Sequence, residues 1–246
     1  MKTIGIIPAR YASTRFPGKP LALLGGRPVI QHVYEQASRC LPEVWVATDD
    51  ERISDCVKAF GGRVVMTSPD HQSGTDRVCE ALKNTGVEAD VVVNIQGDEP
   101  FIMPEQITCL CECFNHDATQ IATLATPFGD NNEAIANANS PKVVTDCHGF
   151  ALYFSRSIVP FIRGVEPSGW GNAFPFLKHI GIYAYRSEVL KEITLLPQSA
   201  LEKAEKLEQL RWLENGYRIR VGITKQETIG IDTPADLQRA EAFLKR

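Results

Sequence analysis

Short apolar segments alternate with amphipathic segments through the first half of the chain, and this pattern constrains the fold more than any other feature. Residues 4–7, 44–47, 64–66, 91–93 and 121–126 are apolar runs of strand length. Between them, apolar residues recur at the spacing of about 3.6 residues that is typical of helices. Strands that alternate with helices form a parallel sheet covered by those helices. We therefore predict an α/β fold with a mixed, mostly parallel sheet and helices on both faces.

The pattern changes in the second half of the chain to longer strands with hairpin signals. Residues 142–145 and 150–154 flank a turn sequence at 146–149, which is the pattern of an antiparallel hairpin. No segment resembles a linker between independent domains. We therefore predict one domain over residues 1–246, with a smaller β-rich extension at about 140–190.

Three later segments complete the predicted secondary structure. Residues 164–174 are rich in Gly, Pro and Ser and are predicted to form a loop. Ser199 and Glu202 form a capping box, which predicts the start of one helix that continues to Gly216. A late strand is expected at 218–223.

The formal net charge of the chain is −4, but the charges are unevenly distributed. Residues 1–34 contain five cationic side chains and no Asp or Glu, so the rest of the chain is acidic. The negative total argues against nucleic acid as a partner, because proteins that bind nucleic acid present broad basic surfaces. The local basic segment instead favours a small anionic ligand at the N-terminal end.

Hydropathy and cysteine usage limit the cellular setting. No apolar run approaches the roughly 20 residues that a helix needs to cross a bilayer, so we expect no membrane partner. The seven cysteines include no Cys-x-x-Cys pair. Cys109, Cys111 and Cys113 fall in a helical pattern, where side chains two positions apart point in different directions and cannot converge on a metal. Free thiols favour a reducing, cytoplasmic compartment.

A basic loop over residues 8–20 follows the first predicted strand and holds Arg10, Arg15 and Lys19. Open α/β sheets bind ligands at the carboxyl ends of their strands. Guanidinium and ammonium groups at this density suit a triphosphate. Pro20 stands where a P-loop has Ser or Thr, so the segment is not that motif. The alternative is a solvated basic loop with no ligand.

Two carboxylates stand at the ends of later strands. Asp98 lies in residues 94–100, directly after an apolar strand, and Asp232 lies between the late strand and the last predicted helix. Mg²⁺ at phosphate sites commonly takes one or two carboxylates. The alternatives are a simple turn at Asp98 and a helix cap at Asp232 or Thr233.

Two further segments carry polar groups that could contact a ligand. Ser73 and Gly74 precede a predicted helix and could donate hydrogen bonds to a ligand, although an ordinary helix start has the same composition. In residues 179–185, strict alternation places His179 and Tyr183 on one polar face of a strand. That face could bind a hydroxylated ligand, be exposed, or pair in a dimer.

Together these motifs resemble the CMP-KDO synthetases (3-deoxy-manno-octulosonate cytidylyltransferases), which are nucleotidyltransferases of the GT-A-like α/β fold. The resemblance runs nearly end to end and rests on residues 7–20, 70–77, 94–100, 151–156, 179–183 and 230–234. Two positions depart from the family pattern. Phe16 stands where Leu is usual and Asp76 where Glu is common, and both changes keep the chemical character of the side chain.

The resemblance implies transfer of CMP from CTP to 3-deoxy-manno-octulosonate (KDO), with release of pyrophosphate and with Mg²⁺ as cofactor, for lipopolysaccharide biosynthesis. The triphosphate and the chemistry would be served by Arg10, Arg15, Lys19 and Asp98. The rest of the nucleotide would contact Ala9, Ser73, Gly74, Arg77, Gln96 and Gly97. The sugar would contact Arg156, His179, Tyr183 and Gln209. The metal would be held by Asp98 and Asp232.

Two alternatives remain at this point. An acylneuraminate cytidylyltransferase would share the CTP loop and differ in the sugar. A catalytically silent nucleotide-binding module could use the same fold, although the presence of Lys19, Asp98 and Asp232 together argues against it. The partners we expect are CTP, KDO and a second copy of the chain, since the apolar strands at about 150–190 favour a homodimer contact.

Overall fold

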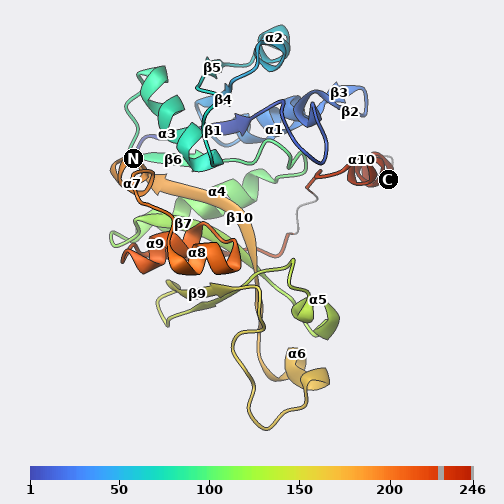
Figure 1. The fold of residues 1–246 in the computed structure, drawn as a ribbon, viewed down its shortest axis with the longest axis vertical. Helices are drawn as coiled ribbons and strands as arrows, with labels where there is room; N and C mark the ends of the chain where they lie inside the picture. The colour runs from blue at the N-terminus through green and yellow to red at the C-terminus, as the bar shows by residue number, and fades with distance from the viewer. Residues whose placement is uncertain (227–229, 245–246) are drawn as a thin grey trace. The chain divides into compact units, whose positions relative to one another are not determined.

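The computed structural model describes residues 1–226 and 230–244 (Figure 1), and contacts within the chain divide it into two compact units. Unit 1 comprises Met1–Thr108, Ala184–Thr194 and Thr228–Arg246, and unit 2 comprises Cys109–Tyr183 and Leu195–Glu227. Each unit is described by itself below.

Unit 1 is built on a parallel sheet with the strand order β6-β1-β4-β5. The strands are β1 (Thr3–Ala9), β4 (Val44–Thr48), β5 (Val64–Met66) and β6 (Val91–Asn94). Every residue of β6 is buried, because both faces of a parallel sheet are covered by helices. The four apolar runs predicted as strands in this part of the chain are confirmed.

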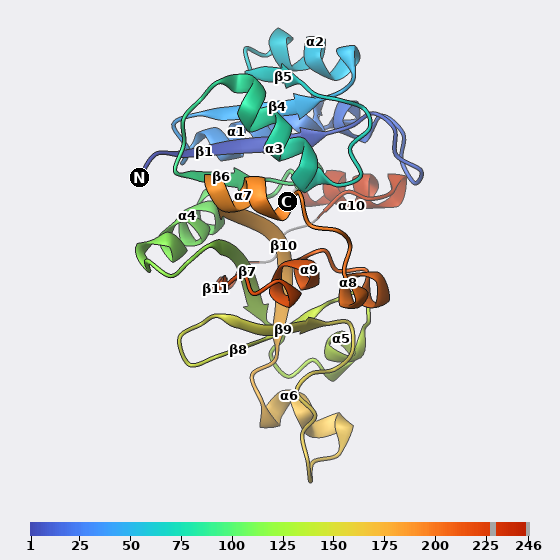
Figure 2. The same ribbon diagram turned by 60° about the vertical axis from the view of Figure 1, so that its left-hand side comes forward.

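The helices of unit 1 cover both faces of this sheet. The three that connect its strands are α1 (Val29–Ser38), α2 (Glu51–Ala59) and α3 (Gly74–Thr85). The chain runs from β1 to β4 to β5 in one direction and then returns through α3 to β6 on the far side of β1. Since such crossovers are right-handed, α3 must lie on the face opposite to α1 and α2; Figure 2 shows it in front of β1. The strand order therefore reverses between β1 and β6, which creates a crevice at their carboxyl ends.

A small apolar core in unit 1 joins segments that are distant in sequence. Leu24, Val29, Ile231 and Ala240 are buried together, and Phe16 packs against them. Several short elements complete the unit: η1 (Lys19–Leu21), β2 (Leu23–Leu24), β3 (Arg27–Pro28), α7 (Ser187–Ile193) and α10 (Pro234–Leu244). Helix α4 (Pro104–Glu112) begins in unit 1 and ends in unit 2. This core holds the end of the basic loop beside the segment that precedes α10.

Unit 2 has a mixed sheet. Its parallel pair is β7 (Ile121–Pro127) and β11 (Ile219–Ile223). The predicted hairpin is confirmed as the antiparallel pair β8 (Lys142–Thr145) and β9 (Ala151–Ser155). Strand β10 (Leu177–Arg186), whose last three residues belong to unit 1, pairs antiparallel with β8. The shorter elements are η2 (Cys113–Asn115), α5 (Asn132–Ala136), η3 (Pro167–Gly169), α6 (Trp170–Ala173), α8 (Ala200–Glu205) and α9 (Gln209–Glu214). The predicted α/β fold with a mixed, mostly parallel sheet is confirmed.

The single helix predicted from Ser199 to Gly216 is wrong, because the structure has two helices there. The capping box of Ser199 and Glu202 starts α8 as expected. Lys206 then adopts a left-handed conformation (φ 54°) and ends the helix. Arg156 donates hydrogen bonds to the carbonyl oxygens of Glu205 and Lys206. This tertiary contact stabilises the break between the two helices. The spacing of apolar residues continues through the break and so does not predict it.

The loop predicted at 164–174 is also partly wrong. Its centre folds into η3 and α6. Trp170 is buried in a small core with Ile135 and Phe176. One aromatic anchor therefore orders a segment whose Gly and Pro content favours a loop.

The described part of the chain contains all seven cysteines and the helices named above. All seven cysteines have free thiols, and burial raises the pKa of the Cys113 thiol to about 12. Among residues 1–226 and 230–244, no group of three or more His, Cys, Asp and Glu side chains is placed to hold a metal. No helix in those ranges is long and apolar enough to cross a membrane.

Candidate active site

A cavity of about 570 Å³ lies in unit 1 where the strand order reverses, at the carboxyl ends of β1 and β6. Four sequence segments line it: part of the basic loop, residues 71–74 with Arg77, residues 96–98, and Asp232. All the residues that the resemblance implied for the nucleotide and the metal line this cavity: Ala9, Arg10, Arg15, Lys19, Ser73, Gly74, Arg77, Gln96, Gly97, Asp98 and Asp232.

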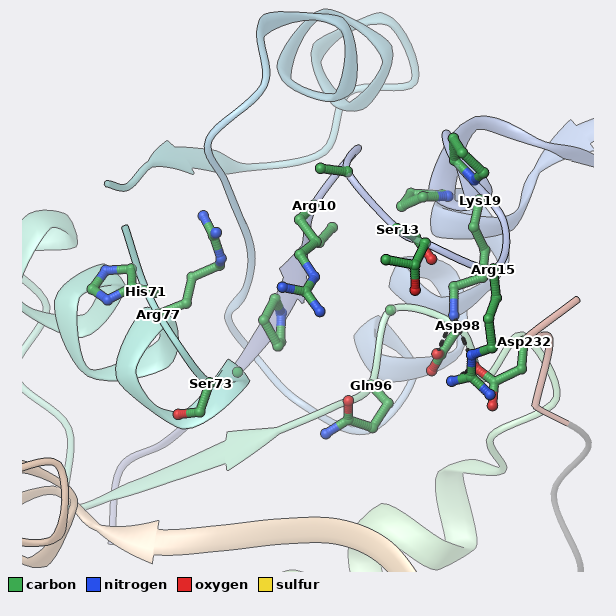
Figure 3. A pocket seen from close by; sticks show the side chains of 18 of the residues that line it. Arg10, Ser13, Arg15, Lys19, His71, Ser73, Arg77, Gln96, Asp98 and Asp232 are labelled. Atoms are coloured by element: carbon green, nitrogen blue, oxygen red, sulfur yellow. Dashed lines mark hydrogen bonds and ion pairs between the residues drawn. The ribbon is translucent and has the colours of Figure 1, made fainter. Parts of the chain in front are cut away.

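Lys19 contacts both predicted metal ligands. Its Nζ lies 2.5 Å from Oδ2 of Asp98 and 3.3 Å from Oδ1 of Asp232. Arg15 lies 3.1 Å from the same oxygen of Asp232 (Figure 3). The side chain of Lys19 is only 14% exposed, so this ammonium group is largely shielded from water. Two cations and two carboxylates thus form one cluster, which lies at one end of the cavity in Figure 3.

The backbone explains why these groups meet. Gly18 adopts a left-handed conformation (φ 72°) and turns the chain into η1, which begins with Lys19. Asp98 follows β6, and its carbonyl oxygen accepts a hydrogen bond of 2.8 Å from the backbone N–H of Ile231. Because Ile231 is fully buried in the core that contains Phe16, Asp232 is held beside Asp98.

The donor set fits Mg²⁺. One ammonium group reaches the carboxylates of both Asp98 and Asp232, so the two carboxylates lie close enough to share a cation. Mg²⁺ prefers oxygen ligands and is usually held by one or two carboxylates together with substrate phosphates and water. Asp98 and Asp232 could therefore supply the protein ligands of such a site, beside a basic loop that suits the phosphates.

Asp232 and the cap of the last helix have separate roles. The carboxylate of Asp236 accepts hydrogen bonds from the backbone N–H groups of Asp232 and Thr233 and from the hydroxyl of Thr233. The capping group at the start of α10 is therefore this pair, and the side chain of Asp232 is left for the cavity. Thr233 Oγ1 also accepts a hydrogen bond of 3.3 Å from the Asp236 N–H, so of the two residues named in the alternative Thr233 caps the helix and Asp232 does not.

Gly97 brings two backbone segments into close approach. A Cβ atom at this position would lie 2.8 Å from the carbonyl oxygen of Pro8. No side chain fits there, because the obstructing atom belongs to the backbone of β1. The floor of the cavity therefore depends on glycine at this position.

Ser73 and Asp76 form a capping box at the start of α3. Ser73 Oγ accepts from the Asp76 N–H at 3.1 Å, and Asp76 Oδ2 accepts from the Ser73 N–H at 3.2 Å. Asp76 therefore makes the reciprocal capping contact at the position where Glu is usual. The N-terminus of α3, with its positive helix dipole, faces the cavity through Ser73 and Gly74.

Arg10 and Arg77, which also line the cavity, differ in their surroundings. Arg77 is buried and donates to Thr67 Oγ1 at 2.6 Å and to Asp49 Oδ2 at 3.0 Å. Arg10 is exposed, points into the cavity in Figure 3 and has no ion-pair partner among the residues that the structure describes. Arg10 is thus the cation most available to an anionic ligand.

Some residues of the cavity wall are not among the site residues predicted from the sequence. Ser13 and Thr14 line it from the basic loop, and His71 and Gln72 line it from the segment before α3. All four lie within residues 8–20 or 70–77, so their position in these candidate ligand-binding segments is the signal that the sequence contains for them. Which of their side chains point inward follows only from the tertiary structure.

In unit 2, the structure brings together two of the residues implied for the sugar. His179 Nε2 lies 3.0 Å from the hydroxyl of Tyr183 and 3.0 Å from Thr123 Oγ1. The predicted common face of β10 is therefore confirmed. Burial lowers the pKa of His179 to about 3, so the imidazole is neutral near pH 7. It offers hydrogen bonds and no positive charge.

Gln209 and Arg156, the other two implied sugar residues, lie in different surroundings. Gln209 is only 4% exposed, and its Nε2 group has no hydrogen-bond partner among the described residues. A buried unpaired donor costs about 1–3 kcal/mol, so a ligand acceptor would stabilise it. Arg156 instead donates to the carbonyl oxygens of Ala138, Glu205 and Lys206.

Comparison with known proteins places this geometry in a family. The family model described as Cytidylyltransferase matches residues 4–221. A relative from Phocaeicola vulgatus is 67% identical over 248 residues, which cover 100% of this chain and 98% of the relative, and is named 3-deoxy-manno-octulosonate cytidylyltransferase. The chain belongs to the cytidylyltransferase family and, within it, to the 3-deoxy-manno-octulosonate cytidylyltransferases.

Two further comparisons agree with this assignment. A relative of the same name from Bacteroides thetaiotaomicron is 63% identical over 247 residues, which cover 100% of this chain and 99% of the relative. A solved structure described as CMP:2-keto-3-deoxy-manno-octonic acid synthetase complexed with CTP is 44% identical, has a TM-score of 0.91, and matches 100% of this chain and 99% of its own. The family predicted from the sequence is confirmed, and the acylneuraminate alternative is not favoured.

Proposed function

We propose that this enzyme transfers CMP from CTP to the anomeric hydroxyl of KDO and releases pyrophosphate, for lipopolysaccharide biosynthesis. The observation that carries the proposal is the contact of Lys19 with both Asp98 and Asp232 in a cavity that also contains the exposed Arg10. Cations for a triphosphate and carboxylates for its metal ion thus share one site. The names of the relatives supply the sugar.

The nucleotide would bind along the cavity of unit 1. Arg10, Arg15 and Lys19 would bind the triphosphate, since guanidinium groups match phosphate oxygens and an ammonium group acts as a point charge. Cytosine and ribose would contact the remaining lining residues: Ala9, Ser73, Gly74, Arg77, Gln96 and Gly97. Gly97 keeps side-chain atoms away from the Pro8 carbonyl, so the two backbones can form one wall.

Asp98 and Asp232 would hold Mg²⁺ together with phosphate oxygens. When bound, Mg²⁺ neutralises phosphate charge and lowers the pKa of a hydroxyl that it contacts. In this structure the ammonium group of Lys19 pairs with both carboxylates. When the two carboxylates bind Mg²⁺, Lys19 would be released from them and could stabilise negative charge on the α-phosphate and on the departing pyrophosphate.

The chemistry requires no nucleophile from the protein, because the sugar hydroxyl attacks the α-phosphorus in line. The protein contributes positioning and electrostatic stabilisation. His179, Tyr183, Gln209 and Arg156 would bind KDO in unit 2. The unpaired Nε2 donor of Gln209 supports this role because sugar hydroxyl and carboxylate oxygens accept hydrogen bonds. The neutral imidazole of His179 suits hydroxyl groups better than a carboxylate.

The substrate pair is tested by pyrophosphate release in the presence of Mg²⁺. We expect release with CTP and KDO, and at most a few per cent of that rate, at equal concentrations, with UTP or with N-acetylneuraminate. A matched assay with EDTA should abolish release, because Mg²⁺ would be removed from Asp98 and Asp232. A preference for N-acetylneuraminate would contradict the proposal and support an acylneuraminate cytidylyltransferase.

We infer that the enzyme is a cytoplasmic homodimer and that the extension at 140–190 forms the contact. Phe161 is 74% exposed and Leu152 is 63% exposed, and large apolar side chains at this level of exposure favour a partner surface. Free thiols at all seven cysteines agree with a reducing compartment.

We expect Phe161→Asp to convert the dimer to a monomer, because a charge in an apolar contact is costly to bury. Light scattering at micromolar concentration measures this, and Leu195→Asp is the control, since Leu195 is also apolar and is 84% exposed but lies outside the extension. A wild-type protein that is already monomeric, or a Phe161→Asp variant that stays dimeric, would contradict the assignment of the contact.

A further inference from the structure

Tyr11 lies in the basic loop next to Arg10, and none of the roles above uses it. It does not line the cavity. Its ring instead contacts an arginine from another element: the guanidinium carbon of Arg52, in the first turn of α2, lies 3.3 Å from the ring centroid. This distance is that of a close cation–π stack.

The same ring packs against the other end of the loop. A Cβ atom on Gly18 would lie 3.0 Å from Cε2 of Tyr11, so the glycine backbone rests on the ring. The backbone N–H of Gly18 also donates a hydrogen bond of 2.9 Å to the carbonyl oxygen of Tyr11. The loop is therefore closed between residues 11 and 18. Arg10 directly precedes this closure and Lys19 directly follows it.

Arg52 is itself held in place by a bidentate contact. Its Nε and NH2 groups lie 2.9 Å and 2.6 Å from the two carboxylate oxygens of Asp50, which caps α2. The side-chain hydrogen bond from Arg52 is the main reason that the pKa of Asp50 lies below its usual value. A charged, oriented guanidinium group thus covers the ring of Tyr11 from a regular element of the fold.

We propose that Tyr11 and Arg52 are positioning residues for the triphosphate site. Their stack holds residues 10–19 in the conformation in which Arg10, Arg15 and Lys19 all face one cavity. Three like charges in ten residues repel one another, and an open loop would lose conformational freedom when CTP binds. The stack orders the loop before the nucleotide arrives. The inference rests on the proposed function, because the ordered loop is proposed to serve the binding of CTP.

The chain offers matched variants to test the stack. Tyr11→Leu and Arg52→Gln each remove one partner, and Tyr11→Phe keeps the ring that makes the contacts. Arg63→Gln is the control, because Arg63 lies farther from its aromatic neighbour, at 5.8 Å from the ring centroid of Trp45, and pairs with Glu43.

Three measurements on the full-length enzyme distinguish positioning from a general loss of stability. We expect Tyr11→Leu and Arg52→Gln to raise the KM and the calorimetric Kd for CTP about tenfold, with the KM for the sugar unchanged. Trypsin should cleave after Arg10 and Arg15 faster than in the wild type, and CTP should restore protection. Tyr11→Phe and Arg63→Gln should match the wild type in all three.

Two outcomes overturn the proposal. One is an unchanged CTP affinity and loop cleavage rate in Tyr11→Leu and Arg52→Gln, even if their melting temperatures fall. The other is damage in Tyr11→Phe as large as that in Tyr11→Leu. Loop cleavage and CTP affinity are measured without turnover, so a wild-type enzyme that fails to use KDO would contradict the proposed function and still leave the stack testable.

Discussion

Asp98→Ala is expected to lower the rate of pyrophosphate release about a thousandfold or more, and Asp232→Ala to do the same. Each change removes one of the two carboxylates that would hold Mg²⁺ against the triphosphate. Losing a single group that stabilises transition-state charge costs about 10²–10³ in rate, and loss of a metal ligand is at least as severe. Steady-state pyrophosphate release at saturating CTP and Mg²⁺ measures the effect.

The fold should survive both substitutions. Lys19 keeps one carboxylate partner in either variant, so the free energy of unfolding should fall by no more than about 2 kcal/mol. Asp55→Ala is the control, since Asp55 is an exposed carboxylate on α2 that pairs only loosely with Lys58. Release at near the wild-type rate by both cavity variants would refute the metal assignment.

Gly97→Ala is expected to destabilise unit 1 and to weaken CTP binding at least tenfold. The added Cβ would lie 2.8 Å from the carbonyl oxygen of Pro8, and that oxygen can move only if β1 moves with it. Overpacking of this kind typically costs about 1–3 kcal/mol. Denaturant unfolding without ligand measures the stability, and calorimetry measures the affinity for CTP.

Gly74→Ala provides the comparison for stability. Its Cβ would lie 3.6 Å from Cγ of Pro8, which is an ordinary contact, and its backbone does not need a positive φ. Alanine at the first position of α3 should therefore change the free energy of unfolding by less than about 0.5 kcal/mol. Equal losses in the two variants would show that backbone approach at Gly97 is not the cause.

The spacing of apolar residues predicts the elements of unit 1 but not the break between α8 and α9. Buried runs such as residues 91–93 and the spacing of apolar residues between them predict the strands and helices of unit 1, because burial of both sheet faces requires that pattern. The break between α8 and α9 has no such signal. It depends on Arg156, which is distant in sequence and binds the carbonyl oxygens at the break.

The candidate site shows the same division. Residue types and their positions after strands indicate cations for phosphate and carboxylates for a metal ion, and the resemblance to a family supplies the sugar. The low pKa of His179 and the unpaired donor of Gln209 follow from burial. Burial depends on how neighbouring elements pack, so neither property could be predicted from the sequence.

By itself, the alternation of strands and helices determined the fold class, and the residues after β1 and β6 determined the chemistry available at their carboxyl ends. Only the tertiary structure decided that these ends are adjacent, because the order β6-β1-β4-β5 depends on the direction of each crossover. It also decided that Lys19 meets Asp98 and Asp232, which requires the core around Ile231. Local sequence sets backbone preference and burial pattern, whereas contacts between distant segments depend on packing.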